Sequence, residues 1–276
     1  MKLLQKIKNF VFERWYIMTI AMLVFILTFQ IIQIIPRAAS SSAMANITDW
    51  GLSFKGDPGA QPKGNISAQE LKKYDAYYVS SNEKKTIYLT FDAGYENGYM
   101  PEILDILRDE QVPAAFFLVG HYLKSQPDLV KRMVEEGHIV GNHTSSHPDM
   151  SKIADIESLK AELGEVESLF RDITGSDLPK YYRPPQGKFN ISNLEQAKQL
   201  GYKTVFWSLA YVDWDTKNQP AEQYALDKLN SRIHNGAVVL LHSTSSTNKN
   251  ILKRLIQDWK SQGYEFKSLD DLVQNA

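Results

Sequence analysis

The stretch that decides the fold is "TIYLTFDAGYENGY", residues 86–99, where an apolar run passes into a single acid, Asp92, followed by Ala93 and Gly94. Residues 86–92 are rich in β-branched and aromatic side chains, a composition typical of a strand. Asp-x-Gly is also a common turn composition. Taken alone, Asp92 is therefore either a turn residue or a functional acid at the end of a strand.

Short apolar runs like this one alternate with helical patterns as far as the C-terminus. We expect strands at residues 86–92, 114–120, 138–142, 180–184, 203–208, 237–243 and 264–268. Apolar residues three and four apart predict helices at residues 100–111, 126–137, 155–175, 192–201, 221–236 and 248–263. The alternation predicts an α/β fold, a distorted (β/α) barrel of about seven parallel strands.

The composition excludes several classes of protein. Of 276 residues, 43% are hydrophobic and 23% charged, which is typical of a folded globular chain. Cysteine is absent, so thiol nucleophiles, disulfides and thiolate metal sites are excluded. Residues 1–45 hold five basic residues and one acidic residue, a charge of +4, and the total is −1, so residues 46–276 carry −5. That sign lacks the basic surface of a nucleic-acid binder.

The N-terminal 45 residues contain a targeting segment. Residues 16–35 are free of charge and, as a helix, long enough to span a hydrocarbon core of ~30 Å. Because Lys and Arg are more frequent before this run than just after it, we expect the N-terminus in the cytoplasm and the rest outside. Ala43-Met44-Ala45 also fits a cleavage site. The segment is thus either a retained membrane anchor or a signal peptide cleaved near Ala45, with the protein held in the membrane or secreted.

We divide the chain into three parts. Residues 1–45 hold the anchor or signal peptide with its linker, residues 46–85 are a lead-in, and residues 86–276 are the expected catalytic domain. The lead-in has a Gly/Pro-rich loop followed by Ser67 and Glu70 at capping-box spacing, which predicts a helix start.

Residues of catalytic types recur where the predicted strands end: Asp92, His143, His147, Arg183, Asp213 and His242. Barrels of this kind build active sites at the carboxyl ends of their strands, so we expect these side chains to lie together. One helical turn would put His143 and His147 on one side as a pair of metal ligands. Local evidence also allows surface histidines, a solvated Arg183, an exposed Asp213 and a His242 bonded only to backbone.

The order and spacing of these residues resemble the polysaccharide deacetylase family with the NodB-type domain, carbohydrate esterase family 4. The family motifs T-F-D-D-G, H-[ST]-x-x-H, R-x-P-x-G, D-x-x-D-W and L-x-H correspond here to "TFDAG", "HTSSH", "RPPQG", "AYVDW" and "LLH", in the same order. More narrowly, "YLTFDAGYENGY", "GNHTSSHPD" and "TVFWSLAYVDW" resemble the muramic δ-lactam-forming de-N-acetylases of endospore-forming bacteria.

The resemblance implies hydrolysis of the N-acetyl group of a peptidoglycan amino sugar. It assigns Asp92 as the catalytic base, His242 as the general acid and Arg183 as the residue that orients the base. It also implies a divalent metal, with zinc the expected ion, held by His143 and His147. In the narrower group the substrate is N-acetylmuramic acid without its stem peptide, the product is muramic δ-lactam, and the setting is spore cortex.

Further assignments follow the same motifs. Asp213 joins the catalytic set as the remaining carboxylate of the fourth motif. Gln186 stands where the family uses a backbone N–H to hold the oxyanion, and we assign Trp214 and Tyr95 to substrate contact. We expect a monomer that binds the glycan strand.

Two positions depart from the family. Ala210 replaces the first acid of the fourth motif, and Ala93 replaces the acidic metal ligand, so we expect a loosely held ion completed by water, substrate or Asp92. Three alternatives stay open: a de-N-acetylase of N-acetylglucosamine, a wall-binding module that has lost catalysis, and a glycoside hydrolase. The last needs two carboxylates flanking the bond, and no second acid stands beside Asp92.

Overall fold

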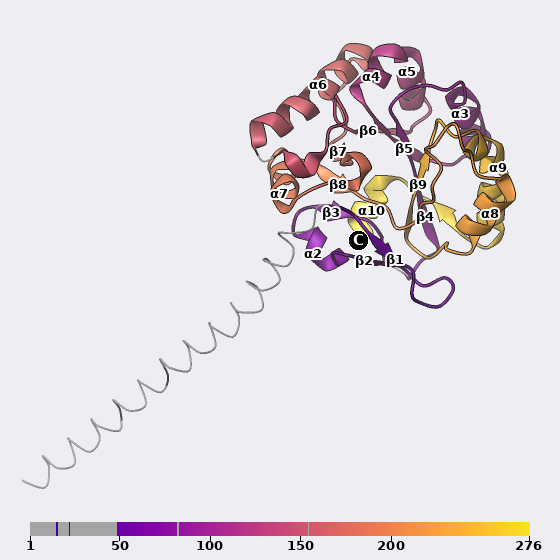
Figure 1. Cartoon of the computed structure of the whole chain (residues 1–276), viewed down its shortest axis with the longest axis horizontal. Helices are drawn as coiled ribbons and strands as arrows, with labels where there is room; N and C mark the ends of the chain where they lie inside the picture. The colour runs from indigo at the N-terminus through magenta and orange to yellow at the C-terminus, as the bar shows by residue number, and fades with distance from the viewer. Residues whose placement is uncertain (1–14, 16–21, 23–48, 82, 154) are drawn as a thin grey trace, which may run out of the picture. The chain divides into compact units, whose positions relative to one another are not determined.

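The computed structural model describes residues 15, 22, 49–81, 83–153 and 155–276 (Figure 1). The predicted cleavage site lies outside these residues, as does the predicted membrane segment apart from Met22. No helix within the described residues is long and apolar enough to cross a membrane. The N-terminal expectations therefore stay predictions. Residues Ile47–Ala276 form one compact unit.

A curled parallel sheet forms the centre of this unit. Its strands are β3 (Ala76–Tyr77), β4 (Thr86–Ala93), β5 (Ala114–Leu118), β6 (Ile139–Asn142), β7 (Tyr181–Tyr182), β8 (Lys203–Val205), β9 (Ala237–His242) and β10 (Glu265–Phe266). Seven strands follow the order β9-β4-β5-β6-β7-β8-β3, and β10 pairs with the start of β4. Just after β8, the N–H groups of Ser208 and Leu209 donate to the Val238 carbonyl of β9 at 2.9 and 3.1 Å. The sheet therefore curls into a half-barrel.

Each of the predicted strands is present, and the lead-in adds to them. It contributes β3 to the sheet and a separate antiparallel pair, β1 (Leu52–Ser53) and β2 (Lys63–Gly64). Helix α2 (Ala68–Lys72) begins at the predicted cap, where the Ser67 hydroxyl accepts a hydrogen bond from the Glu70 N–H at 3.2 Å.

The predicted helices correspond to α3 (Met100–Asp109), α5 (Pro127–Glu135), α6 (Ile156–Thr174), α7 (Ile191–Gln199), α8 (Glu222–Asn230) and α9 (Ser246–Ser261). The structure adds α4 (Gly120–Ser125), α10 (Leu269–Asn275) and two 3₁₀ turns, η1 (Met150–Lys152) and η2 (Pro185–Gly187). Figure 1 shows α3, α5, α6, α8 and α9 along the outside, with α10 nearer the middle of the view.

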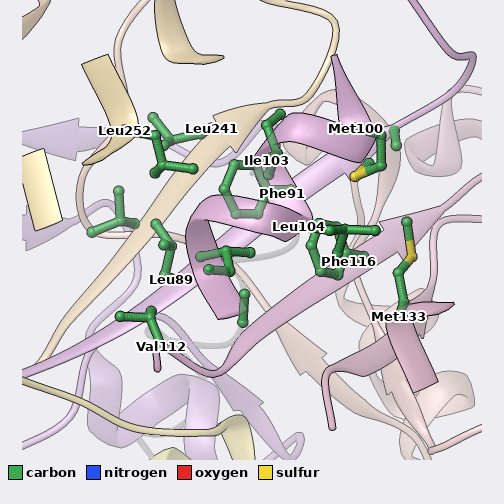
Figure 2. Packing of buried hydrophobic residues seen from close by; sticks show 14 of the residues in the cluster. Leu89, Phe91, Met100, Ile103, Leu104, Val112, Phe116, Met133, Leu241 and Leu252 are labelled. Atoms are coloured by element: carbon green, nitrogen blue, oxygen red, sulfur yellow. The ribbon is translucent and has the colours of Figure 1, made fainter. Parts of the chain in front are cut away.

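Side chains of β4 alternate between two hydrophobic clusters because successive residues of a strand point to opposite faces. Leu89 and Phe91 belong to the larger, outer cluster and pack against α3 and α9, as Figure 2 shows. Tyr88 belongs to a smaller, inner cluster that includes Leu269 and Leu272 of α10. Both faces of β4 are buried, which explains why its sequence reads as a nearly continuous apolar run.

Candidate active site

The alternation that builds the two clusters also collects the polar strand ends on the inner face. In β9, Val239 and Leu241 lie in the outer cluster, so His242 has the opposite orientation. In β4, Asp92 likewise alternates with Phe91. Asp92 and His242 are register partners on neighbouring parallel strands. Because neighbouring strands lie about 4.8 Å apart, the backbones of these two residues are adjacent in the sheet.

Asp92 is held by a buried arginine. Arg183 follows β7 and donates from Nη1 to Asp92 Oδ1 at 2.7 Å, with the two side chains 0% and 7% exposed. The guanidinium also donates from Nε to the Val205 carbonyl at 2.9 Å, and its centre lies 4.2 Å from the ring centroid of Phe117. Burial alone would raise the pKa of Asp92, but the charge of Arg183 holds it below its usual value. Asp92 is therefore ionised at neutral pH.

His143 faces the second oxygen of the same carboxylate. Its Nδ1 lies 2.8 Å from the Arg183 carbonyl oxygen, which only accepts, so Nδ1 carries the proton. The other nitrogen, Nε2, is left with a free lone pair 3.6 Å from Asp92 Oδ2. Burial lowers the pKa of His143 to about 4, so the ring is neutral at neutral pH. The His143 and His147 rings lie 5.0 Å apart, centroid to centroid.

The predicted helical turn between these histidines is wrong. Thr144 and His147 have φ values of 68° and 57°, in the left-handed region, and the segment is a loop. Such a φ is unusual for a β-branched residue and carries strain of about 1–3 kcal/mol, which the surroundings must offset. The Asn142 side chain accepts from the Thr144 N–H at 2.9 Å, and the Thr144 hydroxyl accepts from the His147 N–H at 3.1 Å. These bonds bring the two rings together without a helix.

His242 is bound to a buried acid. Its Nδ1 lies 2.7 Å from Asp213 Oδ1, and its backbone N–H donates to Asp213 Oδ2 at 2.9 Å. Asp213 is 1% exposed, whereas the His242 side chain is 26% exposed. Burial alone would lower the pKa of His242, but the Asp213 carboxylate raises it above its ordinary value. Among the described residues no hydrogen bond engages the Nε2 atom of His242, so this atom is available to a substrate.

The donor set fits a divalent ion held by two imidazoles. His143 presents a lone pair whose direction is fixed by its other nitrogen, and His147 lies against it. Within the described part of the chain, no three or more side chains of His, Asp or Glu are grouped to hold an ion. Ala93 is 1% exposed, and its methyl group belongs to the outer hydrophobic cluster. The expectation that water, substrate or Asp92 completes the coordination stays a prediction.

The remaining predicted residues, Tyr95, Trp214 and Gln186, are exposed, and their roles stay predictions. Tyr95 and Trp214 are 47% and 61% exposed, and within the described residues no hydrogen bond joins either side chain to Asp92 or His242. Gln186 is exposed and lies in η2 with φ 57°.

Trp50, which was not among the predicted residues, holds the loop that follows Arg183. Its N–H donates to the Gly187 carbonyl at 2.8 Å and its indole N–H to the Trp207 carbonyl at 3.0 Å. A methyl group on Gly187 would lie 2.8 Å from the Trp207 ring, so only glycine allows this approach. The aromatic "DWG" of the lead-in was the available signal.

Asn248 was also missed. It donates from Nδ2 to Asp213 Oδ2 at 2.6 Å and to the His242 carbonyl at 3.0 Å. Its position three residues before Ile251 places it on the buried stripe of α9. A polar residue on an apolar stripe was a usable signal.

Comparisons with known proteins identify the family. A model of the polysaccharide deacetylase family matches residues 80–205. Peptidoglycan-N-acetylmuramic acid deacetylase PdaA of Bacillus subtilis is 46% identical over 240 residues, covering 86% of this chain and 90% of that protein. Its solved structure, described as a family 4 carbohydrate esterase, superposes with a TM-score of 0.75 at 45% identity, over 81% of this chain and 94% of that one.

The more distant relatives include both a named deacetylase and a described pseudoenzyme. A peptidoglycan-N-acetylglucosamine deacetylase of Bacillus cereus is 32% identical over 75% of this chain and 74% of its own. A family 4 pseudoenzyme of Bacillus anthracis has a TM-score of 0.66 at 28% identity, over 72% of this chain and 68% of its own. The identity and coverage of the first relative, together with the family match, show that this chain belongs to the polysaccharide deacetylase family, carbohydrate esterase family 4, and is a hydrolase of amide bonds.

Proposed function

We propose that the protein removes the N-acetyl group from a peptidoglycan amino sugar, N-acetylmuramic acid without its stem peptide. The observation that carries this proposal is the pairing of Asp92 and His242 on neighbouring strands with opposite pKa shifts. Such a pair supplies an ionised base and a protonated acid at the same pH. The name of the Bacillus subtilis relative supplies the sugar.

In the proposed reaction Asp92 takes a proton from the attacking water. The water oxygen bonds to the acetamide carbonyl carbon, and the C–N bond then breaks. Protonated His242 gives its Nε2 proton to the departing nitrogen, which would otherwise leave poorly as an anion. The products are acetate and a free amine. Arg183 keeps Asp92 ionised and oriented, and Asp213 keeps His242 protonated.

His143 and His147 would hold the divalent ion, which we propose to be zinc. When bound, such an ion lowers the pKa of a bound water and polarises a carbonyl oxygen. Because burial lowers the pKa of His143 to about 4, its ring is neutral at neutral pH and offers the Nε2 lone pair to the ion. We further propose that the Gln186 N–H contacts the oxyanion, and that Tyr95 and Trp214 contact the sugar chain at the rim.

On N-acetylmuramic acid the new amine can close onto the free lactyl carboxyl group with loss of water, giving the δ-lactam. This ring closure, the role in spore cortex and the site of action outside the membrane are parts of the proposal that rest on resemblance. A monomer bound to a glycan strand is the assembly we propose.

Acetate release tests the proposal on three substrates: peptide-stripped peptidoglycan, intact wall and chitin oligomers. We expect release from the stripped material, loss of release with Asp92→Asn, and a muramic product that has lost an acetyl group and then water by mass spectrometry. Release only from chitin oligomers would favour the glucosamine enzyme. Release from none, with retained binding to wall, would favour a module without catalysis.

A glycoside hydrolase is disfavoured by the geometry of the second acid. Asp213 is the other acid of the site, but its side chain is 1% exposed and already accepts from His242 and Asn248. A carboxylate in that position cannot reach a glycosidic bond. Shortened glycan chains without acetate would contradict this argument.

A further inference from the structure

The side chain that fixes the acid dyad is Asn248, the third residue of α9. It is 1% exposed, and its backbone N–H donates to the hydroxyl of the helix-capping Ser245 at 3.1 Å. The helix cap therefore fixes the position of the Asn248 backbone. Because the Asn248 side chain is buried, its amide group must find its hydrogen-bond partners within the protein.

Each polar atom of the Asn248 amide has a partner that permits one orientation only. Nδ2 donates to Asp213 Oδ2 and to the His242 carbonyl oxygen at 2.6 and 3.0 Å. Oδ1 accepts from the Tyr211 hydroxyl. A flipped amide would place its oxygen against a carboxylate and a carbonyl, both of which only accept. The amide is thus a neutral double donor.

The Asn248 amide fixes the orientation of the Asp213 carboxylate, and Asp213 in turn fixes the His242 ring. Asp213 Oδ2 accepts both the Asn248 amide and the His242 N–H, which leaves Oδ1 facing His242 Nδ1. With Oδ2 held at two points the carboxylate cannot rotate. Because Oδ1 accepts from Nδ1–H, the neutral imidazole keeps its proton on Nδ1 and presents Nε2 to the site.

We propose that Asn248 is a positioning residue that locks the Asp213–His242 pair in the orientation needed for proton donation. The proposal deepens the proposed function and rests on it, because it assumes that His242 gives a proton to the substrate. An amide suits this place better than an acid: an ionised carboxyl group here would face the Asp213 carboxylate and repel it. The other titratable or charged groups that interact with His242 are Asp92, Arg183 and His147, and within the described residues no hydrogen bond joins any of them to Asn248.

Asn248→Asp tests the proposal with almost no change in shape. The introduced carboxyl group, when protonated, can still donate to Asp213; once ionised it cannot. An acid in the first turn of a helix is not itself unfavourable to the helix. Since general acid catalysis is worth about 100- to 10,000-fold, we expect kcat to fall about 10- to 100-fold at neutral pH, more at higher pH and less at lower pH, with KM within about threefold.

Asn250→Asp is the matched control. Asn250 lies on the same helix, is exposed, and donates from Nδ2 to Glu222 Oε1 at 2.8 Å. This hydrogen bond involves neither Asp213 nor His242. We expect its kcat and pH profile to stay within about twofold of wild type, because surface substitutions outside networks have small effects. An equal loss of kcat in both variants would overturn the proposal.

A second readout does not depend on turnover. At pH values high enough for the His242 ring to be neutral, its ¹⁵N shifts in the full-length protein report which nitrogen keeps the proton. There we expect wild type and Asn250→Asp to show Nδ1–H, and Asn248→Asp to show a mixture of the two tautomers. If wild type releases no acetate, the proposed function fails, and these signals alone decide the positioning role. If Asn248→Asp does not fold, Tyr211→Phe, which removes the donor that orients the amide, should give the same change more weakly. Unchanged ring signals in the folded variants would overturn the inference.

Discussion

Removing the charge of Arg183 is the sharpest test of how the site is held together. Arg183→Met keeps a long apolar side chain over Phe117 but leaves the Asp92 carboxylate buried without its counter-ion. An ionised group stranded in this way destabilises a protein by about 3–5 kcal/mol. The Val205 carbonyl also loses its Arg183 donor. For a domain of this size, about 3–5 kcal/mol lowers Tm by about 6–20 °C.

The loss of stability should depend on pH in a defined direction. In the wild type the pKa of Asp92 is depressed, so its ion pair contributes stability above about pH 4, the unfolded value, and loses it as pH falls through the folded pKa. In Arg183→Met, burial without the guanidinium raises the pKa of Asp92. The gap in unfolding free energy between wild type and variant should therefore be largest at neutral pH and shrink as pH falls toward 4.

The assay is urea unfolding of the full chain at several pH values, with two further variants. Asp92→Asn added to Arg183→Met removes the stranded charge and should recover at least half of the lost stability. Arg171→Met is the matched control, because Arg171 pairs with Asp177 on the surface, with 58% and 83% of the side chains exposed. A surface pair of that kind contributes about 0–1 kcal/mol. A pH-independent loss, or no recovery in the double variant, would refute the reasoning.

Three further predictions concern the acid, the metal and the sheet. Asp213→Asn removes the carboxylate that raises the pKa of His242, so the limb where kcat falls with rising pH should move to lower pH; an unmoved limb in a pH–rate profile contradicts the assignment of the acid. Ala93→Asp restores the acid of the family motif but starts from the outer hydrophobic cluster, so the buried carboxylate should make the metal-free protein unfold at a lower temperature. If the carboxylate reaches the histidines, zinc should restore stability and bind more tightly than in wild type; equal affinities by calorimetry would show that it does not. Gly141→Ala places a methyl group 2.7 Å from the buried ring of Phe117 and should destabilise the fold by about 1–3 kcal/mol. Gly164→Ala, in helix α6, adds a methyl group with nothing within 4 Å and should stabilise the fold by about 0.5–1 kcal/mol. Similar effects of the two substitutions in thermal melts would contradict the packing.

The elements that carry the site were predictable because their signals are local. Strands β4 and β9 read as apolar runs that end at a polar residue, and Asp92 and His242 were found at the expected edge of the sheet. Helix α6 was predicted to within one residue at each end, since Asp155 caps its start and Gly175 its end.

The conformation of the histidine loop was not predictable from its own residues. H-x-x-x-H spacing is compatible with a helical turn, and nothing local indicates a positive φ at Thr144. The loop is fixed by distant partners: the Thr144 carbonyl accepts from the Gly120 N–H at 3.1 Å, and Ser145 donates to the Glu162 carbonyl at 3.0 Å. A methyl group on Gly120 would lie 2.9 Å from the Ser145 hydroxyl. These contacts come from α4 and α6, so they appear only in the folded chain.

The spacing of base and acid depends on the packing of the sheet as much as on the residues themselves. Asp92 and His242 face each other because β4 and β9 pair in one register from Ile87 to Asp92. A slip of one residue would turn Asp92 toward the helices and bring Phe91 into the site. That slip would remove Leu89 and Phe91 from the outer cluster, which at about 1.5–3 kcal/mol per buried side chain is a large penalty. The hydrophobic core therefore fixes the relation between base and acid, and the hydrogen bonds of Arg183 and Asp213 adjust orientation within it.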